Sequence, residues 1–226
     1  MFSHTPRHLW SHLFARTQSL SEQIISHPFN AALGNGSLSE SDFRAYILQD
    51  LPYLEGHARG MITASRRAPD AAGQALLLRF ANDTIAAEEN IRRTFLEGSP
   101  SEPPPPLPML NDFLKTLDET TSHAPDFGTV LAILIPCPWI YREIGLSLPA
   151  PAPSNPYAWW TDEYRNNPGF SEAVESLCAY ARPHINAVHC PVQRERTIMV
   201  FEKGLQFEHD FFDTFSPRVS ESLKIL

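Results

Sequence analysis

Three side chains with reactive groups interrupt apolar stretches that are predicted to be helical. Cys137 lies between two prolines in the run Ile133-Leu134-Ile135-Pro136-Cys137-Pro138-Trp139-Ile140-Tyr141, whereas Asp50 and Glu208 share faces with aromatic and aliphatic side chains. Carboxylates are seldom buried without a partner or a function. A helix bundle that directed the three groups at one another would place a nucleophile and two acid–base groups in one cavity.

The chemistry of Cys137 depends on its surroundings. If only the sequence around Cys137 is considered, a free cysteine is more often a small buried apolar residue than a nucleophile. A thiol has a pKa of about 8.5, so a reactive thiolate needs a hydrogen-bond donor or a general base close by. No histidine is near Cys137 in the sequence. We therefore expect the substrate or a carboxylate to take the thiol proton, and an apolar cavity to raise the pKa of Glu208 so that it acts as an acid.

Hydrophobic residues at three- and four-residue spacing predict a series of helices. They cover residues 9–25, a long segment from a capping box at 37–40 to about 67, and residues 71–96, 110–121, 127–148, a segment from 171, and about 192–215. Prolines at 52, 138 and 183 each remove a helical hydrogen bond and should bend or end their helices. Residues 30–36 are predicted to be a turn-rich connection, and 99–108 and 149–156 are proline-rich loops.

No segment shows sustained alternation of apolar and polar residues, and none shows the glycine-rich turns of a β-protein. The sequence therefore predicts an all-α multi-helix bundle, folded as a single domain over residues 1–226. The aromatic segment 156–164 fits either core packing or a surface on which a flat ligand stacks.

Charge and cysteine content narrow the function classes. The chain has 226 residues, 26 acidic against 18 basic side chains and a net charge of -8, which argues against nucleic-acid or anionic-membrane partners. Its three cysteines have no metal-ligand spacing and fit a reducing compartment. The N-terminal residues lack a signal-peptide core, and the longest apolar run, 130–137, is too short to span a bilayer. These features predict a soluble, cytoplasmic protein.

Five motifs, in matching order and spacing over nearly the whole chain, resemble those of the TenA-type thiaminase II family. They are Gly34-x-Gly36-x-Leu38, Phe43-x-x-Tyr46-x-x-Gln49-Asp50-x-x-Tyr53-Leu54, Pro136-Cys137-x-Trp139-x-Tyr141-x-x-x-Gly145, Trp160-x-x-x-Tyr164 and Phe207-Glu208-x-x-Phe211-Phe212. The resemblance implies a haem oxygenase-like helical bundle without haem, metal or another cofactor, assembled as a homo-oligomer, usually a tetramer and otherwise a dimer. It also implies hydrolysis of thiamin or of aminopyrimidine (4-amino-5-aminomethyl-2-methylpyrimidine) to hydroxymethylpyrimidine.

The same resemblance assigns roles to individual residues. Cys137 would add to the pyrimidine ring, Glu208 would protonate the leaving amine and assist the attack of water, and Asp50 would bind the ring nitrogen and amino group. The substrate-binding residues would be four aromatic side chains: Tyr53, Tyr141, Tyr164 and Phe211. Tyr46 shares the stripe of Asp50, and packing is its favoured role. Many relatives carry a tyrosine in the segment that corresponds to 110–114, where Phe113 is the candidate substitute.

Two other functions fit the same residues. A di-iron or manganese oxidase would use carboxylates and histidines at helical spacing, but the sequence has no Glu-x-x-His motif, and adjacent Glu208 and His209 point apart. His27 and His57 are predicted to be a helix-end residue and a hydrogen-bonded core residue rather than metal ligands. A regulatory protein could bind a pyrimidine without turnover, although a binder does not need a nucleophile.

Overall fold

The structure is a computed structural model that describes residues 8–96 and 104–216. Within these ranges every regular element is helical, which confirms the all-α prediction. The elements in chain order are α1 (Leu9–Ile25), α2 (Pro28–Asn35), α3 (Glu40–Ser65), α4 (Ala71–Ile91), the π-helical turn η1 (Arg92–Leu96), α5 (Pro108–His123), α6 (Phe127–Leu134), α7 (Pro136–Ser147), α8 (Ala158–Arg165), α9 (Pro168–Asn186) and α10 (Pro191–Phe215).

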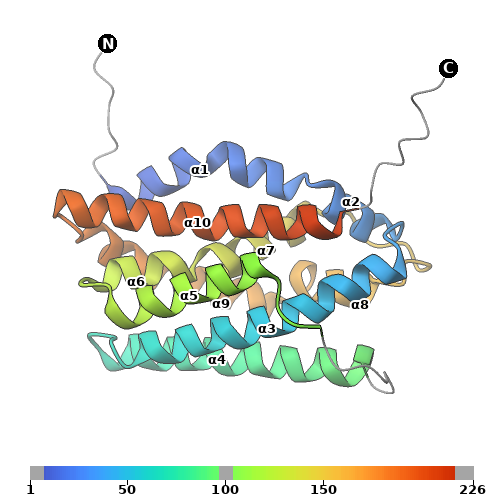
Figure 1. Cartoon of the computed structure of the whole chain (residues 1–226), viewed down its shortest axis with the longest axis horizontal. Helices are drawn as coiled ribbons and strands as arrows, with labels where there is room; N and C mark the ends of the chain where they lie inside the picture. The colour runs from blue at the N-terminus through green and yellow to red at the C-terminus, as the bar shows by residue number, and fades with distance from the viewer. Residues whose placement is uncertain (1–7, 97–103, 217–226) are drawn as a thin grey trace, which may run out of the picture.

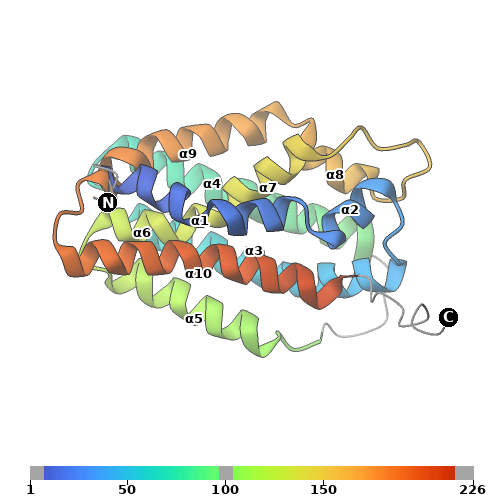
Figure 2. The same ribbon diagram turned by 90° about the horizontal axis from the view of Figure 1, so that it is seen from above.

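The helices pack around an interior formed by α6 and α7. The hairpin of α3 and α4 lies along one side of the bundle, and α1 and α10 lie along the opposite side (Figure 1). Seen from above, α10 lies between α1 and α5, while α9 is at the other edge of the bundle (Figure 2). The residues of α6 from Gly128 to Leu134 are all buried, so this helix forms the centre of the core.

Local sequence explains where many of the helices begin. Prolines occupy the first turn of five helices, where the missing N–H has no helical partner in any case, at Pro28, Pro108, Pro136, Pro168 and Pro191. The side chains of Asp70 and Asp126 cap α4 and α6 by accepting backbone N–H groups. Helix α3 is capped by Ser39, whose hydroxyl oxygen accepts the Asp42 N–H at 3.0 Å. The predicted capping box at 37–40 was therefore two residues too early.

The connection predicted at residues 30–36 was wrong, because α2 covers most of it. This short helix begins with Pro28 and is capped by His27, whose Nδ1 accepts the Phe29 N–H at 3.2 Å. His27 is therefore the helix-end residue predicted from the sequence. The signal for a helix was the His27-Pro28 pair, which marks a start as well as an end.

The predicted helix 127–148 is two helices that meet at Ile135, so the break comes at Pro136 and not at Pro138. Pro138 lies in the first turn of α7, where it leaves the Leu134 carbonyl without a helical donor. The His57 side chain hydrogen-bonds that carbonyl through Nε2 at 3.0 Å. Burial lowers the pKa of His57 to about 4, so this imidazole is neutral and donates the hydrogen bond. The prediction of a satisfied core histidine is confirmed.

The other interior prolines do not end their helices: α3 continues through Pro52 and α9 continues past Pro183 to Asn186. Of the predicted helix 71–96, the last residues form the π-helical turn η1 instead of an α-helix.

The predicted proline-rich loop 99–108 lies partly outside the described residues. Of its described residues, 104–107 are not helical and are held by Gln49, whereas Pro108 already begins α5. The Gln49 side chain donates to the Pro105 carbonyl at 3.2 Å and accepts the Leu107 N–H at 2.8 Å. The second loop is also non-helical and joins α7 to α8.

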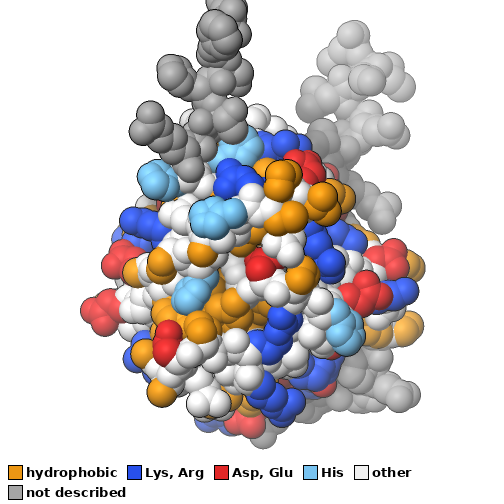
Figure 3. Space-filling view, turned by 90° about the vertical axis from the view of Figure 1, so that its left-hand side faces the viewer, with side chains coloured by type: hydrophobic (Ala, Val, Ile, Leu, Met, Phe, Trp, Pro, Cys, Tyr) orange, Lys and Arg blue, Asp and Glu red, His pale blue; other side chains and the backbone are white. Residues whose placement is uncertain are grey.

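Among the described residues, one stretch, Phe127–Ser147, which comprises α6 and α7, is long and apolar enough to cross a membrane by length and composition, but 72% of its apolar window is buried inside the bundle. This is the pattern of a core helix. On the end of the bundle shown in Figure 3, basic, acidic and histidine side chains are interspersed among apolar ones.

Candidate active site

The three reactive side chains come from three different helices and are all buried. Asp50 lies in the middle of α3, Cys137 in the first turn of α7 and Glu208 in the second half of α10. Their exposed fractions are 2%, 8% and 0%. The structure therefore places two carboxyl groups and a thiol inside one apolar bundle.

A glycine allows α10 to approach α7 at this point. A Cβ atom at Gly204 would lie 2.7 Å from Cγ of Pro136, which is closer than real Cβ contacts allow. Glu208 is one helical turn beyond Gly204, and Cys137 follows Pro136 directly. The close packing of Gly204 on Pro136 thus brings the carboxyl group and the thiol together.

Glu208 is held through only one of its oxygens. The Tyr53 hydroxyl donates to Oε1 at 2.5 Å, whereas Oε2 is buried and has no hydrogen-bond partner among the described residues. An unsatisfied buried polar atom costs about 1–3 kcal/mol, and an ionised one costs more. Burial accordingly raises the pKa of Glu208 to about 7, although hydrogen bonding to Tyr53 and Cys137 opposes the shift. Glu208 can therefore gain or lose a proton near neutral pH.

Burial and the nearby Glu208 carboxylate raise the pKa of the Cys137 thiol well above its ordinary value, while hydrogen bonding to Tyr53 acts in the opposite direction. The pKa of Asp50 is also well above its usual range, because of burial and then of the charge on Glu208. The Asp50 carboxyl makes no hydrogen bond to another side chain in the described ranges. Ionisation of one of these three groups, the thiol and the two carboxyl groups, thus makes ionisation of the other two less favourable.

Two predicted substrate-binding tyrosines lie beside this cluster. The rings of Tyr141 and Tyr164 are 5.0 Å apart, and the Tyr141 hydroxyl is 2.6 Å from that of Tyr46. Gly145 makes this possible, since a Cβ atom there would lie 2.3 Å from the backbone oxygen of Tyr164. Helix α8 therefore packs directly on α7 and places Tyr164, which is partly exposed, against Tyr141.

The other side of the cluster is a wall of phenylalanines. Phe211 is fully buried between Tyr46 and Tyr53, with ring centroids 5.4 and 6.3 Å away. Phe113 stacks on Phe207 at 4.3 Å and lies edge-on to Tyr53 at 5.8 Å. Phe113 therefore lies next to Tyr53, the hydrogen-bond partner of Glu208.

Tyr46, Tyr141 and Tyr164 also line a cavity that has room for about one water molecule. Neither this cavity nor the larger surface groove between α1, α7 and α9 is lined by Cys137, Asp50 or Glu208.

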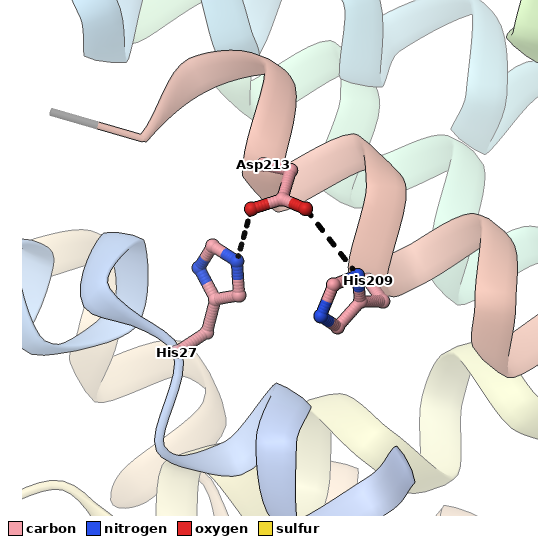
Figure 4. Close-up of side chains that lie close together, drawn as sticks. All are labelled: His27, His209 and Asp213. Carbon is pink, nitrogen blue, oxygen red and sulfur yellow. Dashed lines mark hydrogen bonds and ion pairs between the residues drawn. The ribbon is translucent and has the colours of Figure 1, made fainter. Parts of the chain in front are cut away.

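A second cluster of titratable groups lies on the outer face of α10, where His27 and His209 both point toward Asp213 (Figure 4). Nε2 of His27 lies 3.1 Å from one Asp213 oxygen, and Nδ1 of His209 lies 3.5 Å from the other. Since Nδ1 of His27 accepts the Phe29 N–H, the imidazole proton is on Nε2 and faces Asp213. A metal ion at Nε2 would drive that proton onto Nδ1, against the Phe29 N–H. The cluster therefore fits hydrogen bonding better than metal binding.

The fold is that of solved TenA homologues, an all-α class. A TenA homologue from Pyrococcus furiosus superimposes with a TM-score of 0.82 over 92% of this chain and 99% of that chain, at 16% sequence identity. At this level of identity, the similarity shows the fold alone.

The chain belongs to the TENA/THI-4/PQQC family, whose sequence profile matches residues 14–216. It is 32% identical over 207 residues to the thiamine biosynthesis multifunctional protein ThiED of Corynebacterium efficiens, covering 89% of this chain and 27% of that protein. It is also 32% identical over 160 residues to the aminopyrimidine aminohydrolase of Bacillus subtilis, covering 68% of this chain and 67% of that protein. The chain thus spans about a quarter of the length of the ThiED relatives that it matches.

Packing, the role that the sequence favoured for Tyr46, is confirmed, but sequence reasoning missed the hydrogen bond of its hydroxyl group. Its ring does pack in the core, but its hydroxyl holds that of Tyr141. The signal that could have identified it was its position one turn before Asp50 on the same face of α3. A hydroxyl placed there had to reach a polar partner.

Proposed function

We propose that this protein hydrolyses aminopyrimidine, or thiamin itself, to hydroxymethylpyrimidine, with Cys137 as the nucleophile. The name of the Bacillus subtilis relative, an aminopyrimidine aminohydrolase, supports the substrate class. The observation that carries the proposal is Glu208, a buried carboxyl with a pKa of about 7 and an unpartnered oxygen beside a thiol. Such an arrangement is costly for the fold and suits proton transfer.

In the proposed mechanism, one proton is shared by Cys137 and Glu208. Ionised Glu208 takes the thiol proton as sulfur bonds to a ring carbon, which breaks the aromaticity of the pyrimidine. Protonated Glu208 then gives this proton to the amine on the exocyclic methylene as the carbon–nitrogen bond breaks. Water adds to the methylene, Glu208 accepts its proton, and the bond to sulfur breaks to restore the ring and the thiol. The balance is one water consumed and one ammonia released.

The remaining residues would bind and orient the ring. Asp50 has no side-chain hydrogen-bond partner in the described ranges. Its carboxyl group would accept a hydrogen bond from the amino group of the substrate and bind a nitrogen of the substrate ring. Tyr53 would hold Glu208 in place through its 2.5 Å hydrogen bond. Tyr164 and Phe211 would cover the faces of the ring, and the partly exposed Tyr164 is the side chain best placed to move when the ring enters.

Incubation of the purified protein with aminopyrimidine and, separately, with thiamin tests the proposal by measuring ammonia and thiazole release. Cys137→Ala should lower ammonia release from aminopyrimidine at least about 1,000-fold, because the cluster holds no other thiol. Cys178→Ala is the matched control, since Cys178 is a partly buried thiol of α9 that lines the surface groove, and it should retain full activity. Undiminished turnover by Cys137→Ala would remove the covalent mechanism.

A further inference from the structure

Tyr46 and Tyr141 share a single hydrogen bond inside the bundle. Their hydroxyl oxygens are 2.6 Å apart, although the residues come from α3 and α7. Tyr46 is completely buried, whereas Tyr141 keeps an exposed fraction of 7%. Within the described ranges, the Tyr46 hydroxyl has no other hydrogen-bond partner, because its ring is enclosed by other aromatic side chains: Phe29, Phe43, Trp160, Phe211, Phe212 and Phe215.

The direction of this hydrogen bond decides which hydroxyl proton remains free. Either hydroxyl could donate at this distance, and the direction decides whose proton needs a further acceptor. Leaving a buried donor unsatisfied costs about 1–3 kcal/mol. If Tyr46 donates to Tyr141, the free proton belongs to Tyr141, the more exposed of the two side chains. This arrangement leaves the Tyr141 proton available to a ligand.

We propose that Tyr46 is a positioning residue that fixes Tyr141 as a hydrogen-bond donor into the candidate active site, toward an unprotonated ring nitrogen of the ligand. The inference rests on the proposed function and specifies its ligand as a neutral heteroaromatic ring with an acceptor nitrogen on this side. Asp50 lies one turn from Tyr46 on α3, and Cys137 lies one turn from Tyr141 on α7. The donor, the carboxyl group and the thiol would thus contact one ring from different directions.

The hydrogen bond also strengthens the donor. A hydroxyl that accepts a hydrogen bond becomes a better donor, because the two bonds polarise each other. In Tyr46→Phe the Tyr141 hydroxyl loses this partner and becomes free to rotate away from the ligand. Ring binding should weaken, while the groups that make and break bonds stay in place.

A double-mutant cycle on ammonia release from aminopyrimidine tests this role. Tyr46→Phe should raise KM about 3- to 10-fold and change kcat less than about 2-fold, as expected for one lost hydrogen bond. In a Tyr141→Phe background, the added Tyr46→Phe substitution should have no further effect on KM, because it acts only through Tyr141. Equal effects of Tyr46→Phe in both backgrounds would overturn the proposal.

Tyr157→Phe is the matched control. Tyr157 is also buried, and its hydroxyl donates to the Leu38 carbonyl at 2.7 Å, outside the candidate site. Its loss should lower the free energy of unfolding by an amount similar to the loss of the Tyr46 hydroxyl and leave KM unchanged. A rise in KM equal to that of Tyr46→Phe would show that lost stability alone explains both variants and would overturn the positioning role.

A measurement without substrate separates this inference from the proposed function. A fluorotyrosine placed at position 141 reports the hydrogen bond to its hydroxyl through its fluorine NMR shift. Tyr46→Phe should change that shift, and Tyr157→Phe should not. An unchanged shift in Tyr46→Phe would overturn the hydrogen-bond assignment. If the unsubstituted protein releases no ammonia, the proposed function fails, and the fluorine shift still decides whether Tyr46 donates to Tyr141.

Discussion

Glu208 and His209 are neighbours on α10, yet they belong to two very different clusters of titratable groups. Glu208 faces the interior with Cys137 and Asp50, and its exposed fraction is 0%. The His209 side chain is 22% exposed and joins His27 and Asp213 on the outer face of the helix. One helix thus presents a polar group inward and another outward within a single residue step.

The two clusters differ in how well their polar atoms are satisfied. On the outer face, His27 and His209 both pair with Asp213, and the other nitrogen of His27 accepts a backbone N–H. In the interior, Oε2 of Glu208 has no hydrogen-bond partner in the described part of the chain. A satisfied cluster at the surface stabilises the fold modestly, whereas an unsatisfied one in the core persists at a cost. This contrast is the physical reason to assign chemistry to the inner cluster only.

The largest expected effect is a loss of catalytic activity when a residue of the inner cluster is substituted. Glu208→Gln should lower kcat/KM for aminopyrimidine about 100- to 10,000-fold, since it removes proton transfer without changing the shape of the side chain. In the unsubstituted protein, kcat/KM should rise as the pH passes about 7, because the active form has Glu208 ionised and the thiol protonated.

The pH profile supplies the decisive detail of that experiment. The residual activity of Glu208→Gln should not show the rise near pH 7. If the rise persists in this variant, another group is responsible for it, and Glu208 is not the base that accepts the thiol proton.

The next effect concerns stability, and its sign follows from the pKa of Glu208. Its value is 4.5 when unperturbed and about 7 in the folded protein, so the folded state binds more protons between these pH values. The free energy of unfolding therefore falls as pH rises through this window. A glutamine side chain cannot ionise, so the stability of Glu208→Gln should not fall in this window. The free energy of unfolding of the variant, minus that of the unsubstituted protein, should therefore be about 2–3 kcal/mol larger at pH 8 than at pH 5. Urea unfolding at the two pH values measures the difference.

Glu202→Gln is the control, since Glu202 is a surface residue of α10 that is paired with Arg16. Its effect on stability should differ by less than about 0.5 kcal/mol between the two pH values. A similar pH dependence for both variants would mean that Glu208 does not carry the buried, raised pKa.

The inner cluster was predictable from sequence because burial and periodicity are local signals. Asp50 and Glu208 each interrupt an apolar stripe at helical spacing, so their inward direction follows from their own helices. Family resemblance supplied the pairing of the helices. The close approach that brings Glu208 to Cys137 was not predictable, because it depends on Gly204 meeting Pro136 from a distant helix.

Three features of the fold that the sequence misplaced or left open have a common physical cause. The start of α2, the break at Pro136 and the fully helical α9 all depend on where a proline falls relative to a helix terminus. A proline in the first turn starts a helix at no cost in hydrogen bonds, whereas deeper in the helix its cost can be offset by packing. The sequence identifies the proline but not which turn it occupies. The partnership of His27 with Asp213 was likewise hidden, because it joins residues almost a whole chain apart.

The smallest expected effect belongs to the outer cluster. Asp213→Ala removes the shared partner of His27 and His209, but Asp213 is 61% exposed, so the free energy of unfolding should fall by no more than about 1 kcal/mol. Ammonia release should stay within about 2-fold of the unsubstituted protein. Equimolar zinc should leave the Tm of both proteins unchanged, because the His27 proton faces Asp213. A zinc-dependent rise in Tm that Asp213→Ala abolishes would instead make the outer cluster a metal site, since a ligand that binds the folded state raises its stability.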